Sequence, residues 1–240
     1  MTASLKSPRD SKKNNPVKFI IALSISLALV CQAFSQEISL EEILDRTTEA
    51  IKIEDNRKKA SVFEFTEKII FSKLNKKGEC EDVDTVISRV RMKGDEELSR
   101  EILYSSSDED TKKKKKKESK AQIKTAFSID DPDYSYELLE ETEDAYIVSI
   151  TPRKKKPDKG QIKGKIYIDK DSFLIKTMDF IVPRPEKLKE LSMRFELARL
   201  DNGLYVVSDM RMNGYVKFLF GVVKFRFRVE GEFCDYAVCE

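Results

Sequence analysis

The stretch AYIVSITPRKKKPDKGQIKGKIYIDKDSFLIKTMDF, residues 145–180, indicates how this chain folds. Apolar residues occupy alternate positions in three short runs, and polar turn residues separate the runs. Alternation with a period of two is typical of β-strands that have one dry face and one wet face. Parallel pairing would require crossover helices, for which the connections are too short. The stretch therefore predicts consecutive strands joined as an antiparallel meander.

The lysines of this stretch raise the question of a nucleic-acid-binding patch. Residues 153–160 hold a run of basic residues together with Pro157, Asp158 and Gly160, which are turn residues. Lys163 and Lys165 alternate with isoleucines and are predicted to point into water. We interpret the basic cluster as a hairpin tip and as the wet face of an edge or outer strand, where lysines discourage pairing between sheets.

The same alternation extends to both sides of this stretch. The fold class predicted from it is mainly β, with an α+β organisation. Residues 96–105 have an ambiguous period and fit a strand or a short helix. The acidic stretch ELLEETED (137–144) is interpreted as a solvated loop, and sugar hydrolysis by a carboxylate pair there is the less favoured alternative. Further alternating runs cover residues 61–74, 84–92, 191–200, 204–212 and 222–233. In 204–212, Leu204, Val206, Met210 and Met212 are predicted to share one face.

One helix is predicted before the strands, in ISLEEILDRTTEAIKI (38–53). Ser39 and Glu42 fit a capping box, and Ile38 with Ile43 fits a hydrophobic staple. The apolar residues recur at helical spacing and are expected to pack on the sheet. This stripe comprises Leu40, Ile43, Leu44, Thr47 and Ile51.

The N-terminus has the order of a secretory signal peptide. A basic segment precedes the uncharged run FIIALSISLALV (19–30), and small residues follow at Ala33 and Ser35. Twelve residues are short for a spanning helix, which needs about 20; an uncleaved anchor is the alternative. The predicted organisation is a signal peptide at 1–35 and one domain at 36–240, with a flexible lysine-rich loop at about 106–122. Export to the periplasm is expected.

Composition argues against several classes of function. The chain has no histidine, which removes the usual general base and most metal sites. It also lacks nucleotide-binding glycine motifs. Without residues 1–35, 40 basic and 42 acidic residues remain, whereas a dedicated nucleic-acid binder is expected to be net basic. A non-enzymatic protein without cofactor, metal or nucleic-acid partner is expected.

Two further features leave alternatives open. Of the three remaining cysteines, Cys234 and Cys239 could bond only if a turn lies between them. The pairing of Cys80 is equally open, and so is the oligomeric state.

Lys112 to Lys117 lie among acidic residues and are interpreted as a solvated loop. The alternative with a functional role is contact of these lysines with an anionic membrane surface.

The order of these segments resembles the LolA/LolB-like outer-membrane lipoprotein-sorting superfamily. The resemblance rests on the helix SLEEILDRTTEAI, on residues 145–180 and on LARLDNGLYVVSDMRM (197–212). It implies a strongly curved antiparallel sheet, or half-barrel, with an N-terminal helix and few helices against its concave face. It also implies an apolar cavity that holds acyl chains. The candidate cavity residues are Phe63, Phe65, Phe71, Tyr146, Val148, Ile166, Met178, Phe180, Met193 and Phe195; ordinary core packing is the alternative for each.

The function expected from this resemblance is binding of lipid or lipoprotein acyl chains for transport or sorting to the outer membrane. Burial of an acyl chain contributes about 0.8 kcal/mol per CH₂ group, so such binding needs no catalytic group. The alternative is a structural or sensory envelope protein that binds a protein partner through its sheet edges or basic loops.

Overall fold

A computed structural model describes residues 38–106, 129–183, 185, 188–218 and 223–239. Its elements belong to one unit, Leu40–Glu240. The predicted signal peptide, the Lys112 to Lys117 run and most of the predicted loop at 106–122 lie outside the described residues.

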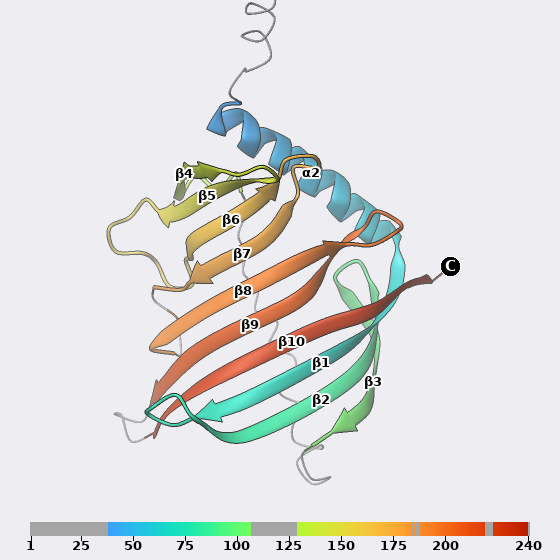
Figure 1. The fold of residues 1–240 in the computed structure, drawn as a ribbon, viewed down its shortest axis with the longest axis vertical. Coiled ribbons are helices and arrows are strands. Elements are labelled where there is room, and N and C mark those ends of the chain that lie inside the picture. Colours follow the sequence, from blue (N-terminus) through green and yellow to red (C-terminus); the bar gives the residue numbers. More distant parts are fainter. Residues whose placement is uncertain (1–37, 107–128, 184, 186–187, 219–222, 240) are drawn as a thin grey trace, which may run out of the picture. The chain divides into compact units, whose positions relative to one another are not determined.

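Ten strands of the described chain form one antiparallel sheet (Figure 1). Their order is β3-β2-β1-β10-β9-β8-β7-β6-β5-β4, so most neighbours in sequence are also neighbours in space. The two outermost strands, β3 and β4, do not pair with each other within the described chain, and the sheet is therefore open. The strands are β1 (Val62–Leu74), β2 (Cys80–Lys93), β3 (Glu96–Ser105), β4 (Tyr134–Glu141), β5 (Ala145–Pro152), β6 (Lys163–Asp169), β7 (Ile175–Ile181), β8 (Glu190–Arg199), β9 (Tyr205–Phe218) and β10 (Val223–Cys239).

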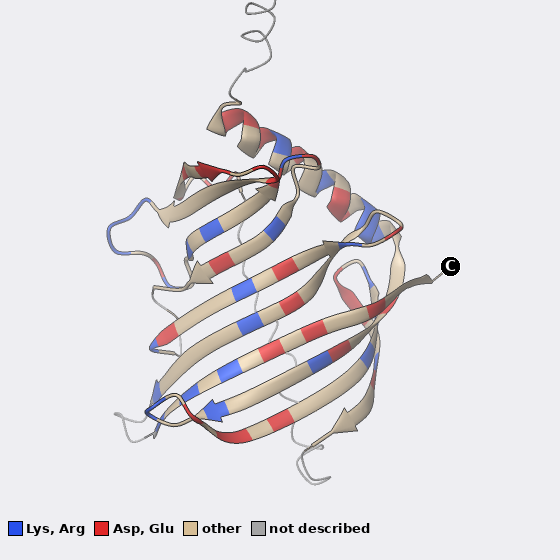
Figure 2. Ribbon diagram, in the orientation of Figure 1, with Lys and Arg blue, Asp and Glu red and all other residues tan. Residues whose placement is uncertain are grey.

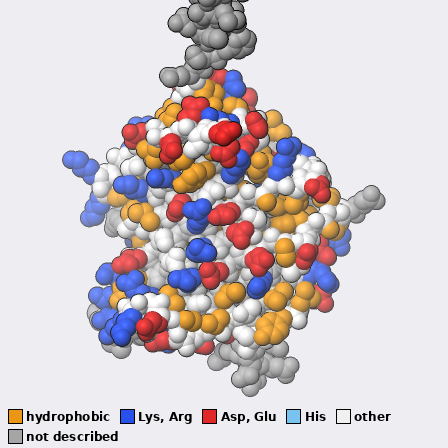
Figure 3. Space-filling model, in the orientation of Figure 1, with side chains coloured by type: hydrophobic (Ala, Val, Ile, Leu, Met, Phe, Trp, Pro, Cys, Tyr) orange, Lys and Arg blue, Asp and Glu red, His pale blue; other side chains and the backbone are white. Residues whose placement is uncertain are grey.

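The register gives the sheet one apolar face and one charged face. Directly opposed residues of an antiparallel pair share a face. The apolar face can be followed across seven strands through the pairs Val148–Ile166, Ile166–Met178, Phe180–Met193, Met193–Met212, Met212–Val229 and Val229–Phe71. The charged face carries ion pairs such as Lys68–Glu232 at 3.4 Å and Arg211–Glu230 at 3.3 Å. Figures 2 and 3 show charges of both signs spread over the central strands.

Helix α2 (Leu40–Ala60) begins directly after Ser39, where the capping box is predicted, and continues seven residues beyond the predicted Ile53. Its side chains at Ile43 and Thr47 are fully buried, which confirms that the stripe packs. The helix runs past successive turns of the sheet. The Arg46 guanidinium lies 5.0 Å from the ring centroid of Phe173 in the β6–β7 turn.

Three sequence predictions are wrong in detail. The acidic stretch 137–144 is not wholly a loop, because β4 extends to Glu141, and exposed glutamates on an edge strand give no apolar alternation. The lysines of β6 do not protect an edge, since β6 lies between β5 and β7. Val206 does not share a face with Met210, because Ser208 is an extra residue in β9 where the register shifts between Glu196 and Leu197 of β8. On the two sides of such a bulge, the side chains of β9 alternate in opposite order.

The other segments follow the prediction. Residues 96–105, whose period fits a strand or a short helix, form strand β3. The hairpin of the opening stretch is confirmed: β5 ends at Pro152, Gly160 has a φ of 82°, and Ile162 is buried. Within the described chain the cysteines are free thiols.

Candidate functional site

All ten candidate cavity residues lie on the apolar face. The register pairs given above place those of β1 and of β5 to β8 on this side of the sheet. They nevertheless form two groups. Half of them are buried core with at most 7% exposure, namely Tyr146, Val148, Ile166, Phe180 and Met193. The others are half-buried, namely Phe63, Phe65, Phe71, Met178 and Phe195.

A cavity of about 360 Å³ lies between α2 and the apolar face. Ligand pockets usually measure about 300–1,000 Å³, so this volume fits a small ligand or part of an acyl chain. Met178 is the member of the ten candidates that contributes to its wall. Its apolar lining consists of Ile51 from α2, Ile129, Leu174 from the β6–β7 turn, and Ile175, Met178 and Leu197 from the sheet.

Charged side chains form the other part of the cavity lining. They come from α2 as Lys52, Glu54, Asp55 and Lys58, and from the segment before β4 as Asp130. Lys52 and Asp55 are exposed and lie at the opening, whereas the Glu54 carboxylate is buried in the cavity wall. A ligand with an apolar body and a polar end would match this division.

One carboxylate, that of Glu54, is buried beside the cavity. Glu54 is 5% exposed, and its Oε1 accepts a hydrogen bond from the Tyr205 backbone N–H at 2.7 Å. Three residues along the helix, Arg57 donates to the carbonyl oxygens of Asn202 at 3.1 Å and Gly203 at 3.4 Å. These bonds hold the C-terminal half of α2 against the β8–β9 turn and fix the distance between helix and sheet.

A polar network continues from Tyr205, which also lines the cavity. The Tyr205 hydroxyl lies 3.3 Å from Ser172 Oγ, and the Ser172 hydroxyl donates a hydrogen bond to Asp169 at 2.7 Å. Lys176 forms an ion pair with Asp169 at 2.5 Å. Burial by itself would raise the pKa of Asp169, but the hydrogen bonds from Lys176 and Ser172 outweigh it and hold the pKa below its ordinary value.

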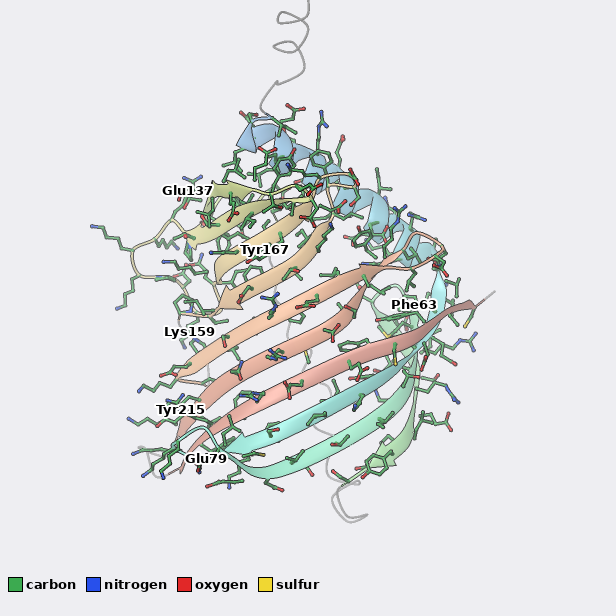
Figure 4. The ribbon with its side chains drawn as sticks, viewed as in Figure 1. Phe63, Glu79, Glu137, Lys159, Tyr167 and Tyr215 are labelled. Carbon is green, nitrogen blue, oxygen red and sulfur yellow. The ribbon has the colours of Figure 1, made fainter. Side chains whose placement is uncertain are left out.

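A second apolar area lies on β1 and β10. Phe65 stacks on Tyr236 with ring centroids 5.0 Å apart, and Phe63 and Phe233 each lie 6.1 Å from Phe65. The Tyr236 hydroxyl donates to the Val207 carbonyl at 2.6 Å, and burial raises the pKa of its phenol. These half-buried rings form an aromatic cluster on the same face as the cavity (Figure 4 labels Phe63).

Sequence reasoning missed Glu54, Leu197 and Tyr205. A signal for Glu54 was present, because it continues the apolar stripe of α2 three residues after Ile51, and an acidic residue at a buried helical position needs a partner. Leu197 continues the alternation of Met193 and Phe195 along β8, so its face was predictable, although its place in the cavity wall was not. Tyr205 reaches this face through the register shift at Ser208 of β9, for which the sequence carries no comparable signal.

The described residues contain no group of three or more acidic or cysteine side chains placed to hold a metal ion. In the described part of the chain, no helix has both the length and the apolar character needed to cross a membrane.

The fold and the site define an open antiparallel half-barrel with a helix across its apolar face and a cavity beneath that helix. No protein-family model matches the sequence, and no curated protein matches it. Similar solved structures include a LolA superfamily protein, NE2245 from Nitrosomonas europaea, with 12% identity over 85% of this chain and 94% of that one (TM-score 0.34).

Two more structures extend this likeness. An outer membrane lipoprotein-sorting protein domain from Vibrio parahaemolyticus has 11% identity over 81% of this chain and 93% of that one, with a TM-score of 0.34. A chain of the Pseudomonas aeruginosa MucA/MucB complex has 9% identity over 79% and 94%, with a TM-score of 0.26.

Proposed function

We propose that this protein is an exported, non-enzymatic envelope protein that binds lipid or lipoprotein acyl chains beneath α2, for transport or sorting to the outer membrane. The observation that carries the proposal is the cavity of about 360 Å³, with an apolar wall from the sheet and charges at its opening. An acyl chain would enter between Ile51 and Leu197, and its polar end would remain near Lys52. Each buried CH₂ group would contribute about 0.8 kcal/mol.

Displacement of a dansyl-labelled fatty acid by palmitate tests this proposal, with native mass spectrometry to count bound ligands. Leu197→Trp would place an indole in the cavity, so palmitate affinity should fall at least about tenfold, or 1.4 kcal/mol. Ile70→Trp is the matched control, because Ile70 is an aliphatic residue of the opposite, charged face. Equal affinity of the Leu197→Trp protein and the control would contradict binding in this cavity.

A protein partner is the second candidate function. Edge strand β3 has no neighbour on its outer side among the described strands. It also exposes apolar side chains, with Leu98 at 47%, Ile102 at 52% and Tyr104 at 53%. An open edge with such side chains can accept an added strand. Replacing Ile102 by Lys should abolish capture of an envelope partner through this edge and leave palmitate binding unchanged.

A further inference from the structure

The lower corner of the sheet in Figure 2 carries an excess of positive charge. It is formed by the tip of the β1–β2 hairpin, by the adjoining ends of β9 and β10, and by the segment before β8. Five exposed lysines define this surface, which we call the basic corner: Lys76, Lys77, Lys189, Lys217 and Lys224. The labels Tyr215 and Glu79 in Figure 4 mark its position.

The register brings like charges together at this corner. Lys217 of β9 and Lys224 of β10 are direct cross-strand partners. Like charges placed directly opposite each other destabilise a sheet. Two residues further in, Tyr215 pairs with Arg226, whose guanidinium carbon lies 5.2 Å from the tyrosine ring centroid. The Lys189 ammonium lies 5.3 Å from the same centroid. The fold therefore gathers cations here at a cost in stability.

The acidic residues of this corner are already engaged. Glu190 lies 4.0 Å from Arg226, Glu81 lies 3.3 Å from Lys73, and Glu79 accepts a hydrogen bond from Asn75 at 2.8 Å. By contrast, no lysine of the basic corner has a carboxylate within 4.0 Å in the described part of the chain. The positive charge is thus not neutralised locally, unlike that of the charged face, where Arg211 and Lys68 pair with glutamates.

We propose that the basic corner docks this protein on an anionic lipid bilayer. Clustered lysines are attracted to anionic lipid headgroups, and each contributes within about a Debye length of the surface. A tyrosine with an apolar ring and a polar hydroxyl suits the headgroup level of a bilayer. Docking by this corner is independent of whether the cavity beneath α2 holds a ligand, because the two surfaces share no residue.

Sedimentation with vesicles tests the proposal. Full-length protein should bind vesicles of phosphatidylethanolamine and phosphatidylglycerol, and should not bind vesicles of phosphatidylcholine alone. Replacing Lys76, Lys77, Lys217 and Lys224 by Gln should weaken binding to the anionic vesicles at least about tenfold. Raising the salt from about 0.1 M to about 0.5 M should have a similar effect on the wild type, because screening shortens the range of the attraction.

The matched control replaces Lys154, Lys155, Lys156 and Lys159 by Gln. It removes the same charge from the β5–β6 hairpin tip, where Figure 4 labels Lys159. This variant should retain vesicle binding within about twofold. An equal loss in both variants would mean a response to net charge alone, and no loss in the corner variant would also overturn the proposal. If the corner variant keeps vesicle binding but loses binding to polyglutamate, the surface recognises acidic protein instead.

Discussion

Glu54 of α2 and Tyr205 of β9 are joined by a hydrogen bond of 2.7 Å between the carboxylate and a backbone N–H, 151 positions apart in the chain. The carboxylate is almost completely buried. Because Tyr205 opens β9 beside the cavity, this bond sets where the helix lies over the sheet. Glu54 is unusual because it is an acidic residue on an apolar helix stripe. The bond connects it to the space in which a ligand would bind.

Removal of this carboxylate should destabilise the fold. Glu54→Ala leaves the Tyr205 N–H buried without an acceptor, which should cost about 1–3 kcal/mol of unfolding free energy. Glu54→Gln keeps an oxygen acceptor and should cost less. Urea denaturation measures both variants, with Glu49→Ala, an exposed residue of the same helix, as control. A loss of stability for Glu54→Ala no larger than that for Glu49→Ala would show that the bond does not hold the helix.

Gly164 of β6 should not tolerate a side chain. A Cβ at this position would collide with the Asp179 carbonyl oxygen and lie 2.9 Å from the Cα of Phe180, both parts of the neighbouring β7 backbone. Backbone cannot move aside as a flexible side chain can, so Gly164→Ala should cost about 3 kcal/mol. Gly231→Ala is the control, because its nearest neighbours at 3.0–3.2 Å are the ends of side chains. Similar denaturation midpoints for the two variants would argue against this close approach of β6 and β7.

Most of the fold could be predicted because it depends on short-range rules. Each strand of residues 145–180 has its own alternation, and polar tips such as the one at Gly160 separate the strands, so an antiparallel order follows. Strand β4 was missed because Glu137, Glu140 and Glu141 lie on an edge strand whose exposed side chains show no apolar period.

The site was less predictable, because it depends on how elements meet. The sequence could place all ten candidates on one face, yet it could not tell which part of that face α2 covers. That depends on the Glu54–Tyr205 contact and on the register shift at Ser208, which turns Tyr205 of β9 toward the cavity. Neither feature changes the periodicity that local reasoning detects.

The Asp169–Lys176 pair should make stability depend on pH. Because the pKa of Asp169 is lowered in the folded state, its contribution is present above the unfolded carboxyl pKa of about 3.9 and is lost as the pH falls through the folded value. The difference in unfolding free energy between wild type and Asp169→Asn should therefore be largest near neutral pH and should shrink below about pH 4.

Urea denaturation across this pH range measures that difference. Asp171→Asn removes a carboxylate of the same turn for which the described structure shows no hydrogen bond, and it should give a smaller pH-dependent difference. A difference for Asp169→Asn that stays constant with pH would contradict the stabilising role of the pair.

The two groups of candidate residues should respond differently to truncation. Ile166 is fully buried, so Ile166→Ala should cost about 2–5 kcal/mol through lost burial and a new cavity. Phe65 is half-buried, and Phe65→Ala should cost less because part of its ring already contacts solvent. Ile181→Ala, at a residue of the charged face that is 50% exposed, should stay within about 0.5 kcal/mol of wild type. Equal costs for Ile166→Ala and Phe65→Ala in denaturation would mean that the aromatic cluster is as closed to solvent as the core. The space beneath α2 would then be the one place on the apolar face of the described chain open to an acyl chain.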